Sequence, residues 1–479
     1  MKRTPKKKGP YLVFTVLLMA IVFTSCTPAV TTEIETPTLT PTLTQIPTLT
    51  VTPPLPEFTP TPTERAGLEI DPEDIAGSVL RFAHPWVGEP AQVLENIAED
   101  FSTNNPWDIR VEVYPHGGET ALVSALQGYL EAGEMPDLIT AHPYLLSGLE
   151  GEIALADLSA YFYDPEWGFD DTAQADIIPV FLEPFTMEDQ ILALPFAPQA
   201  TVLFYNQTWG EALGFTESPD SLNSFRRQSC EATFVNWRDE NPDTDGTGGW
   251  KINLNPTVLA SWYYAFGGVI PGDDLPQFNN QAGQEAFGFL WDVKIEGCSW
   301  FARQPDPYAY FANRFALLYA GHLDQVPIQM NWMEALGSED EWEVIGFPGP
   351  SGETILIDVP GLMMFKADSP ENELAAWLFA KHLLEPEVQA QIVRSMFTLP
   401  VRESAMDLLA DFEVEYPQWA QGAAMLDSAS ALPISQGWGI AQWVLQDGIF
   451  RLLQAEANQA PIILEQMDDM IEDLVGNSP

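Results

Sequence analysis

Short apolar runs alternate with stretches of helical periodicity along most of this chain. The run 79–83 is followed by apolar residues at helical spacing over 93–101, and the alternating segment 109–113 by a second helical pattern over 121–130. Residues 138–141 then form a compact apolar run after a proline. This order predicts an α/β fold in which parallel strands form a doubly wound sheet flanked by helices.

Two loops at the ends of predicted strands carry candidate binding residues. In doubly wound sheets, ligands bind beyond the carboxyl ends of the strands. His84 and Trp86 follow the first predicted strand, and His142 and Tyr144 follow the third. Each loop offers an aromatic ring beside a hydrogen-bonding group, so we expect these four side chains to face a ligand. Most of the other rings, among 15 Trp and 27 Phe, are expected in the core.

The N-terminus has the pattern of an export signal. Residues 1–8 carry five basic side chains and no acidic one, and residues 11–23 form a predominantly apolar run that ends close to Cys26. This run is shorter than the roughly 20 residues that a membrane-spanning helix needs, so we predict a signal peptide over 1–26. A cysteine in this place predicts a lipid anchor on Cys26, at the outer face of the bacterial cytoplasmic membrane.

The segment after Cys26 cannot build a core. Of the 37 residues from 27 to 63, 14 are Thr and 9 are Pro. Such a composition predicts a disordered, semi-extended stalk that holds the folded part away from the envelope. The same bias permits O-glycosylation, and a plain linker is the alternative.

The charge balance excludes polyanionic partners. Removal of the signal would leave 15 basic residues against 69 acidic ones, a formal net charge of −54. Nucleic acid and anionic lipid surfaces would be repelled by such a field. The charge is explained mainly by solubility, but it favours a neutral or cationic ligand.

Two cysteines remain once Cys26 is assigned to the anchor. Cys230 and Cys298 form an even pair in an exported protein, which predicts a disulfide. Two buried free thiols are the alternative, because cysteine also packs as a small apolar residue.

Five later segments, in their order along the chain, resemble one family. They are 190–206 with its Leu-Pro and Tyr-Asn pairs, 315–321 (Phe-Ala-Leu-Leu-Tyr-Ala-Gly), 344–350 (Val-Ile-Gly-Phe-Pro-Gly-Pro), 361–366 (Gly-Leu-Met-Met-Phe-Lys) and 399–402 (Leu-Pro-Val-Arg). This order is similar to that of the family 1 extracellular solute-binding proteins, the maltose-binding-protein-like receptors of ABC importers. The resemblance spans about 77–475, essentially the whole folded part.

The resemblance implies a two-lobed periplasmic-binding-protein fold of type II. The lobes would be joined by crossing segments at 190–206, 344–350 and 399–402. The expected divisions of the chain are a signal peptide at 1–26, a stalk at 27–69, lobe 1 at 70–204 and 349–398, and lobe 2 at 205–348 and 399–479. The implied function is capture of a sugar or oligosaccharide between the lobes and its delivery to membrane permease subunits, by a monomer without a cofactor.

The resemblance also implies contact residues, and a sugar suits their chemistry because it has hydroxyls on its rim and an apolar C–H face. Gln199 stands where the family's maltose receptors have a ligand-contacting Glu, and an amide can both donate and accept hydrogen bonds. His142 and Tyr144 lie in a loop that contacts ligand in the family. Trp438 resembles a late platform ring, and Asn255 is a further transferred position.

Three histidines could in principle form a metal site. His84, His142 and His322 all fall in predicted cleft loops, and three imidazoles would suit zinc. They include no close pair, and hydrogen bonding to hydroxyls explains the same placement, so we expect no metal and count His322 as a ligand contact. Residues 243–246 resemble part of a calcium loop but lack its third acid and its distal Glu, which favours a solvated turn.

Two other classes of function share these features. A secreted glycosidase would use a pair of carboxylates, and 69 acidic residues supply many. The chain has no Gly-x-Ser-x-Gly, His-Glu-x-x-His or phosphate-loop motif, so we expect no enzyme. A surface sugar sensor or adhesin would have the same stalk and fold.

Overall fold

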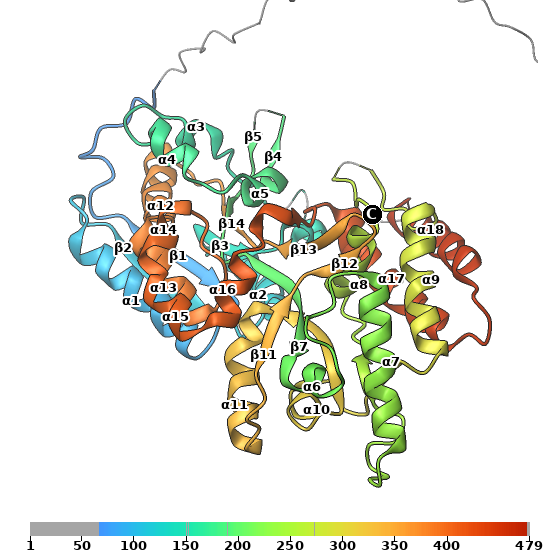
Figure 1. The fold of residues 1–479 in the computed structure, drawn as a ribbon. Helices are drawn as coiled ribbons and strands as arrows, with labels where there is room; N and C mark the ends of the chain where they lie inside the picture. The colour runs from blue at the N-terminus through green and yellow to red at the C-terminus, as the bar shows by residue number, and fades with distance from the viewer. Residues whose placement is uncertain (1–66, 150, 152, 189, 273, 477–479) are drawn as a thin grey trace, which may run out of the picture. The chain divides into compact units, whose positions relative to one another are not determined.

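The computed structural model describes residues 67–149, 151, 153–188, 190–272 and 274–476. The signal peptide, Cys26 and nearly all of the expected stalk lie outside the described residues. The described residues belong to one unit of the chain, 64–479. It contains two main sheets flanked by helices, which confirms the predicted α/β class (Figure 1).

The first sheet has five strands and is built mainly from the N-terminal part of the chain. Its order is β2 (Arg110–Pro115), β1 (Val79–His84), β3 (Leu138–Ala141), β14 (Gly361–Met364) and β6 (Leu194–Pro195). β1 pairs in parallel with β2 and β3, as the alternating pattern predicts. β14 is antiparallel to both of its neighbours, because the chain enters this strand from the second sheet.

The second sheet has eight strands. The order is β12 (Phe347–Gly349), β13 (Gly352–Asp358), β7 (Gln199–Asn206), β10 (Ala316–His322), β8 (Gly248–Lys251) and β9 (Ser299–Trp300), with β11 (Trp342–Ile345) beside β7 and β15 (Ala429–Ala431) beside β13. β7 pairs antiparallel with β10, β11 and β13. A separate hairpin consists of β4 (Thr186–Met187) and β5 (Gln190–Ile191).

Helices cover both sheets. The α-helices are α1 (Glu89–Asn104), α2 (Glu119–Ala132), α3 (Ser159–Phe162), α4 (Asp171–Ala175), α5 (Pro179–Leu182), α6 (Gln207–Ala212), α7 (Leu222–Arg238), α8 (Pro256–Ala265), α9 (Gln281–Ile295), α10 (Tyr308–Ala312), α11 (Val326–Leu336), α12 (Pro370–Leu383), α13 (Pro386–Met396), α14 (Glu403–Met406), α15 (Ala410–Glu415), α16 (Pro417–Ala423), α17 (Gln436–Gln454) and α18 (Ala460–Gly476). Short 3₁₀ helices are η1 (Pro143–Leu149), η2 (Glu183–Phe185), η3 (Leu323–Gln325), η4 (Asp407–Leu409) and η5 (Leu426–Ser428). Within the described ranges, no helix is at once long enough and apolar enough to span a bilayer.

The chain passes between the two sheets in adjacent segments. Residues 196–198 connect β6 to β7, and residues 359–360 connect β13 to β14. The Phe196 amide donates to the Pro360 carbonyl at 2.9 Å, and the Leu399 amide donates to the Pro198 carbonyl at 2.8 Å. Backbone hydrogen bonds therefore tie the two connections and the segment at Leu399 together.

Two of the expected boundaries between the lobes fall inside strands of the second sheet. The boundary expected between 204 and 205 falls inside β7, and the one between 348 and 349 falls inside β12. The segment 344–350 stays in the second sheet, because its proline-rich end leads into a tight hairpin in which Gly349 pairs with Gly352. Gly352 has a φ of 123°, a conformation that favours glycine. The return to the first sheet comes only after Asp358.

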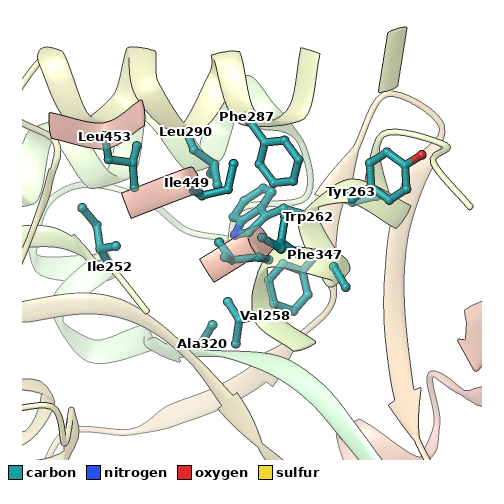
Figure 2. Packing of buried hydrophobic residues seen from close by; sticks show 14 of the residues in the cluster. Ile252, Val258, Trp262, Tyr263, Phe287, Leu290, Ala320, Phe347, Ile449 and Leu453 are labelled. Carbon is teal, nitrogen blue, oxygen red and sulfur yellow. The ribbon is translucent and has the colours of Figure 1, made fainter. Parts of the chain in front are cut away.

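Each sheet has its own core, and a third cluster joins them. The first core includes Phe82, Leu94 and Phe379. The second core surrounds Trp262, which lies among Phe287, Leu290, Phe347 and Ile449 in Figure 2. The third cluster contains Ile139 and Met363 from the first sheet together with Val202, Phe204 and Tyr319 from the second. The sheets are thus in apolar contact beside the connections.

Candidate functional site

The loop after β3 places a histidine between two carboxylates from other elements. His142 Nδ1 lies 2.8 Å from Glu119 Oε2 at the start of α2, and Nε2 lies 2.9 Å from Asp358 Oδ1 at the end of β13. We call these three side chains the Glu119–His142–Asp358 cluster. The side chain of His142 is 11% exposed, that of Glu119 is 24% exposed and that of Asp358 is 21% exposed. Both ring nitrogens of His142 are occupied, so in this conformation the imidazole has no free nitrogen for a ligand.

In this cluster, the pKa values of His142 and Asp358 are shifted in the directions that favour their charged forms. Burial alone would lower the pKa of His142, but the carboxylates of Asp358 and Glu119 outweigh burial and raise this pKa well above 6.5. Burial alone would raise the pKa of Asp358, but His142 outweighs it and lowers this pKa. Both shifts favour an imidazolium beside an Asp358 carboxylate.

Tyr144 connects this cluster to the helices of the second core. Its ring stacks on His142 with 5.3 Å between centroids and 24° between planes. The ring also packs against the second core, and a Cβ atom on Gly439 of α17 would lie 2.9 Å from it. Burial raises the pKa of the Tyr144 phenol to about 12. Tyr144 therefore extends from a loop of the first sheet to α17.

A cleft of about 940 Å³ lies beside Tyr144. On the side of the first sheet, the lining includes residues of η1, α5, η2 and the β4–β5 hairpin. On the side of the second sheet, it includes the turn after α8 and the segment from β15 to α17. The polar side chains in its described lining are Tyr144, Glu183, Thr186, Tyr264, Ser430, Ser435 and Gln436. Glu183 is the one charged group among these described residues, so the cleft can offer rings and neutral hydrogen-bonding groups. We call it the Tyr144 cleft.

A second polar group lies where β10 meets α8. The Asn255 side chain caps α8 by accepting from the Thr257 amide at 2.9 Å, and it also accepts from the Thr257 hydroxyl at 2.8 Å. His322 Nε2 lies 3.4 Å from the Thr257 hydroxyl, and Nδ1 lies 3.3 Å from the Thr201 hydroxyl. The structure thus brings Asn255 and His322 together through Thr257. Both side chains already have partners on the protein.

The loop after β1, which carries His84 and Trp86, does not line the Tyr144 cleft. His84 is fully buried at the end of β1, and neither ring nitrogen has a hydrogen-bond partner among the described residues. Burial, with a smaller contribution from His116, lowers the pKa of His84 to about 4, which favours a neutral ring. Trp86 is half-buried and packs against Phe196, with 5.5 Å between ring centroids. Neither His84 nor Trp86 lines the Tyr144 cleft.

Gln199 and Trp438 differ in what they can offer to a ligand. Gln199 pairs with Asp358 across β7 and β13, and its buried Oε1 atom has no hydrogen-bond partner among the described residues. Trp438 is 0% exposed and belongs to the second core. This corrects the expectation of a platform ring, because a fully buried ring presents no face to a ligand in this conformation. The neighbouring residues 432–436 line the cleft instead.

The sequence prediction missed Glu119, Asp358 and Tyr264. Glu119 begins α2 directly after two glycines, and Asp358 ends β13 directly before the connection at 359–360. Both are therefore at ends of elements, where functional side chains gather in this class of fold. Tyr264 lies in an apolar aromatic run that the sequence alone assigns to the core.

The predicted disulfide between Cys230 and Cys298 is confirmed in the structure. Within the described ranges, these two residues and Glu296 also form the one group of three potential metal ligands that lie within 4.8 Å of one another. The two sulfurs are bonded to each other, so they are not free to ligate a metal. In the turn that resembles a calcium loop, Asp243 and Asp245 are exposed to solvent.

Comparison with known proteins gives one family. Residues 96–424 match the family model described as bacterial extracellular solute-binding protein, which covers more than half of the chain. No curated protein matches this chain.

Many solved structures share the fold. The cyclic alpha-maltosyl-1,6-maltose binding protein from Arthrobacter globiformis has a TM-score of 0.71 and 17% identity, over 84% of this chain and 100% of that chain. The sugar-binding protein MalE from Xanthomonas citri has a TM-score of 0.70 and 17% identity, over 83% and 98%. UgpB from Mycobacterium tuberculosis, in complex with glycerophosphocholine, has a TM-score of 0.64 and 15% identity, over 82% and 98%. At these identities the likeness shows the two-lobed fold alone.

Proposed function

This chain belongs to the bacterial extracellular solute-binding proteins, and from that membership we propose that it captures a sugar or oligosaccharide in the Tyr144 cleft. It then delivers this ligand to the membrane permease subunits of an ABC importer, as a monomer and without catalysis. The family gives the chain a solute-binding role outside the cytoplasm. The sugar and the importer are the proposed part.

The observation that carries the proposal is that the described lining of the Tyr144 cleft is rich in rings and neutral polar groups and has no cationic side chain. Its described residues include the rings of Tyr144 and Tyr264 and several hydroxyl and amide groups, but no Lys, Arg or His. Aromatic rings and neutral hydrogen-bonding groups suit the apolar face and the hydroxyls of a sugar. A phosphodiester such as glycerophosphocholine would instead call for a cationic partner. The volume of about 940 Å³ falls in the range of about 300–1,000 Å³ that is usual for ligand sites.

We select the proposed ligand contacts by the exposure of their side chains to solvent. Tyr144 supplies the ring against which a sugar stacks. Gln199, Asn255, His322 and Trp86 do not line the cleft in this conformation, but they stay as proposed contacts because each is incompletely buried. His84 and Trp438 are left out, because both are fully buried.

The location of the protein on the cell is a further part of the proposal. Cys26 carries a lipid, and the Thr/Pro segment 27–63 acts as the spacer between this anchor and the folded unit. A receptor tethered in this way would stay close to its permease after it releases its ligand.

Calorimetry with the full chain tests the proposed ligand class. We expect equimolar binding of maltotriose, which chromatography should recover unchanged, and no binding of glycerophosphocholine. Tyr144→Ala should weaken maltotriose binding about tenfold or more, since it removes one stacking surface worth about 1–3 kcal/mol. Trp237→Ala is the matched control, because Trp237 is 65% exposed on α7 and does not line the cleft.

Two outcomes would contradict the proposal. Tighter binding of glycerophosphocholine than of every oligosaccharide tried would assign another ligand class. Recovery of shortened sugars would mean that the protein is a glycosidase.

A further inference from the structure

The loop formed by His142, Pro143 and Tyr144 follows a strand of the first sheet but contacts elements of the second. His142 Nε2 lies 2.9 Å from the carboxylate of Asp358, which ends β13 of the second sheet. The Tyr144 ring packs against the second core beside Gly439 of α17. The other nitrogen of His142 binds Glu119 of α2, a helix that precedes β3. One imidazole thus connects the two parts of the fold and supports the ring that lines the Tyr144 cleft.

The hydrogen bonds of this imidazole depend on its proton. An imidazolium has two N–H groups and can donate to both carboxylates, whereas a neutral imidazole has one donor and one acceptor nitrogen. Loss of the proton would leave a nitrogen lone pair facing one carboxylate oxygen at about 2.8–2.9 Å. It would also leave Glu119 and Asp358 without the cation between them, in a site that is mostly shielded from water.

We infer that protonated His142 is a latch that holds the loop 142–144 against the second sheet and positions Tyr144, so that cleft closure and sugar affinity are linked to a proton. His142 is here a positioning residue and not a ligand contact. The link to affinity rests on the proposed sugar-binding function, whereas the link to closure can be tested without ligand.

The groups that face His142 fix the direction of the pH dependence. They are Glu119 from α2, Asp358 from β13 and Tyr144 from η1, while His322 from β10 acts on the charge of Asp358. The carboxylates raise the pKa of His142 above its unfolded value of 6.5 despite burial, so the latch is fully formed below pH 6.5 and is lost as the pH rises through the higher folded value. With a pKa of about 12, Tyr144 stays protonated across that range.

The first test follows His142 in the full chain without ligand. Histidine-selective ¹³C labelling gives five ring signals, and His142→Gln identifies the one that belongs to residue 142. We expect this signal to titrate well above pH 6.5, and small-angle scattering to show a larger radius of gyration once it has titrated. Asp358→Asn should move the titration to lower pH, whereas His322→Gln should leave it above 6.5. Titration at or below 6.5 in the unsubstituted protein would overturn the latch.

The second test measures maltotriose affinity against pH by calorimetry. For the unsubstituted protein we expect weaker binding as the pH rises through the His142 transition. For Asp358→Asn we expect about five- to tenfold weaker binding at pH 7 and a pH profile displaced to lower pH. Asp340→Asn is the matched control, because it removes a carboxylate that pairs with Arg314, outside the cleft and without a histidine. Its pH profile should equal that of the unsubstituted protein.

The two tests fail in different ways. If maltotriose does not bind at any pH, the proposed sugar ligand fails, and the titration and scattering data still decide on the latch. If maltotriose binds with the same pH profile in the unsubstituted protein and Asp358→Asn, the proposed function stands and the latch is overturned.

Discussion

Substitution of Trp438 by alanine distinguishes a core ring from a ligand platform. The ring is 0% exposed and lies in the second core with Ala441, Leu445 and Ile449 from the same helix. A buried aromatic side chain removes about 150–250 Å² from water, which at about 25 cal/mol per Å² corresponds to about 4–6 kcal/mol. Measured Trp→Ala substitutions in cores cost about 3–5 kcal/mol. We therefore expect a loss of about 3–5 kcal/mol in the free energy of unfolding.

Urea unfolding followed by circular dichroism, with calorimetry on the same samples, measures both effects. Trp438→Ala should unfold at a much lower urea concentration, but molecules that remain folded should bind maltotriose with nearly unchanged affinity. Tyr144→Ala should show the opposite pattern, with weaker binding and a smaller loss of stability. Trp438→Phe should recover most of the lost stability, because it restores an apolar ring. An unchanged unfolding midpoint together with tenfold weaker binding for Trp438→Ala would refute the assignment of this ring to the core.

Three further predictions concern covalent and charged links. Removal of the disulfide by joint substitution of Cys230 and Cys298 with serine should cost about 4 kcal/mol of unfolding free energy, since it releases a loop of 68 residues; an equal unfolding midpoint with and without the bond would contradict this estimate. Asp176→Asn should lower the melting temperature at pH 7 but have little effect at pH 2. Arg402 and hydrogen bonds from Ser404 outweigh burial and lower the pKa of the Asp176 carboxyl, so this stabilisation is present above about pH 4 and is lost in acid; equal losses at both pH values would argue against it. Cys26→Ser should release the protein from membranes into the soluble fraction, and firm membrane attachment of this variant would exclude the lipid anchor.

The order of strands and helices could be predicted from the sequence because each local pattern carries its own period. The helix over 89–104 buries Leu94, Ile97 and Phe101, as their spacing indicates. The strand 138–141 has the predicted bounds. The cysteine pair could also be predicted, because no other cysteine was left to pair.

The candidate site could be predicted only in part, because its contacts join distant segments. His142 was recognised from its place after a strand, but its partners lie 23 and 216 residues away, at Glu119 and Asp358. No local pattern reports such a pairing. The side chain of Trp438 was misassigned for a different reason: the segment 432–436 does line the cleft, but the first turn of α17 rotates the next ring into the core.

The position of β14 in the first sheet bears on how the protein reaches its compartment. This strand, residues 361–364, lies between β3 and β6, so the sheet stays split in two until that part of the chain is present. The second core likewise requires α17 and α18, which end at residue 476. Neither part can be completed by the first two-thirds of the polypeptide. A chain that is still being synthesised or exported would therefore remain open until these late segments have emerged.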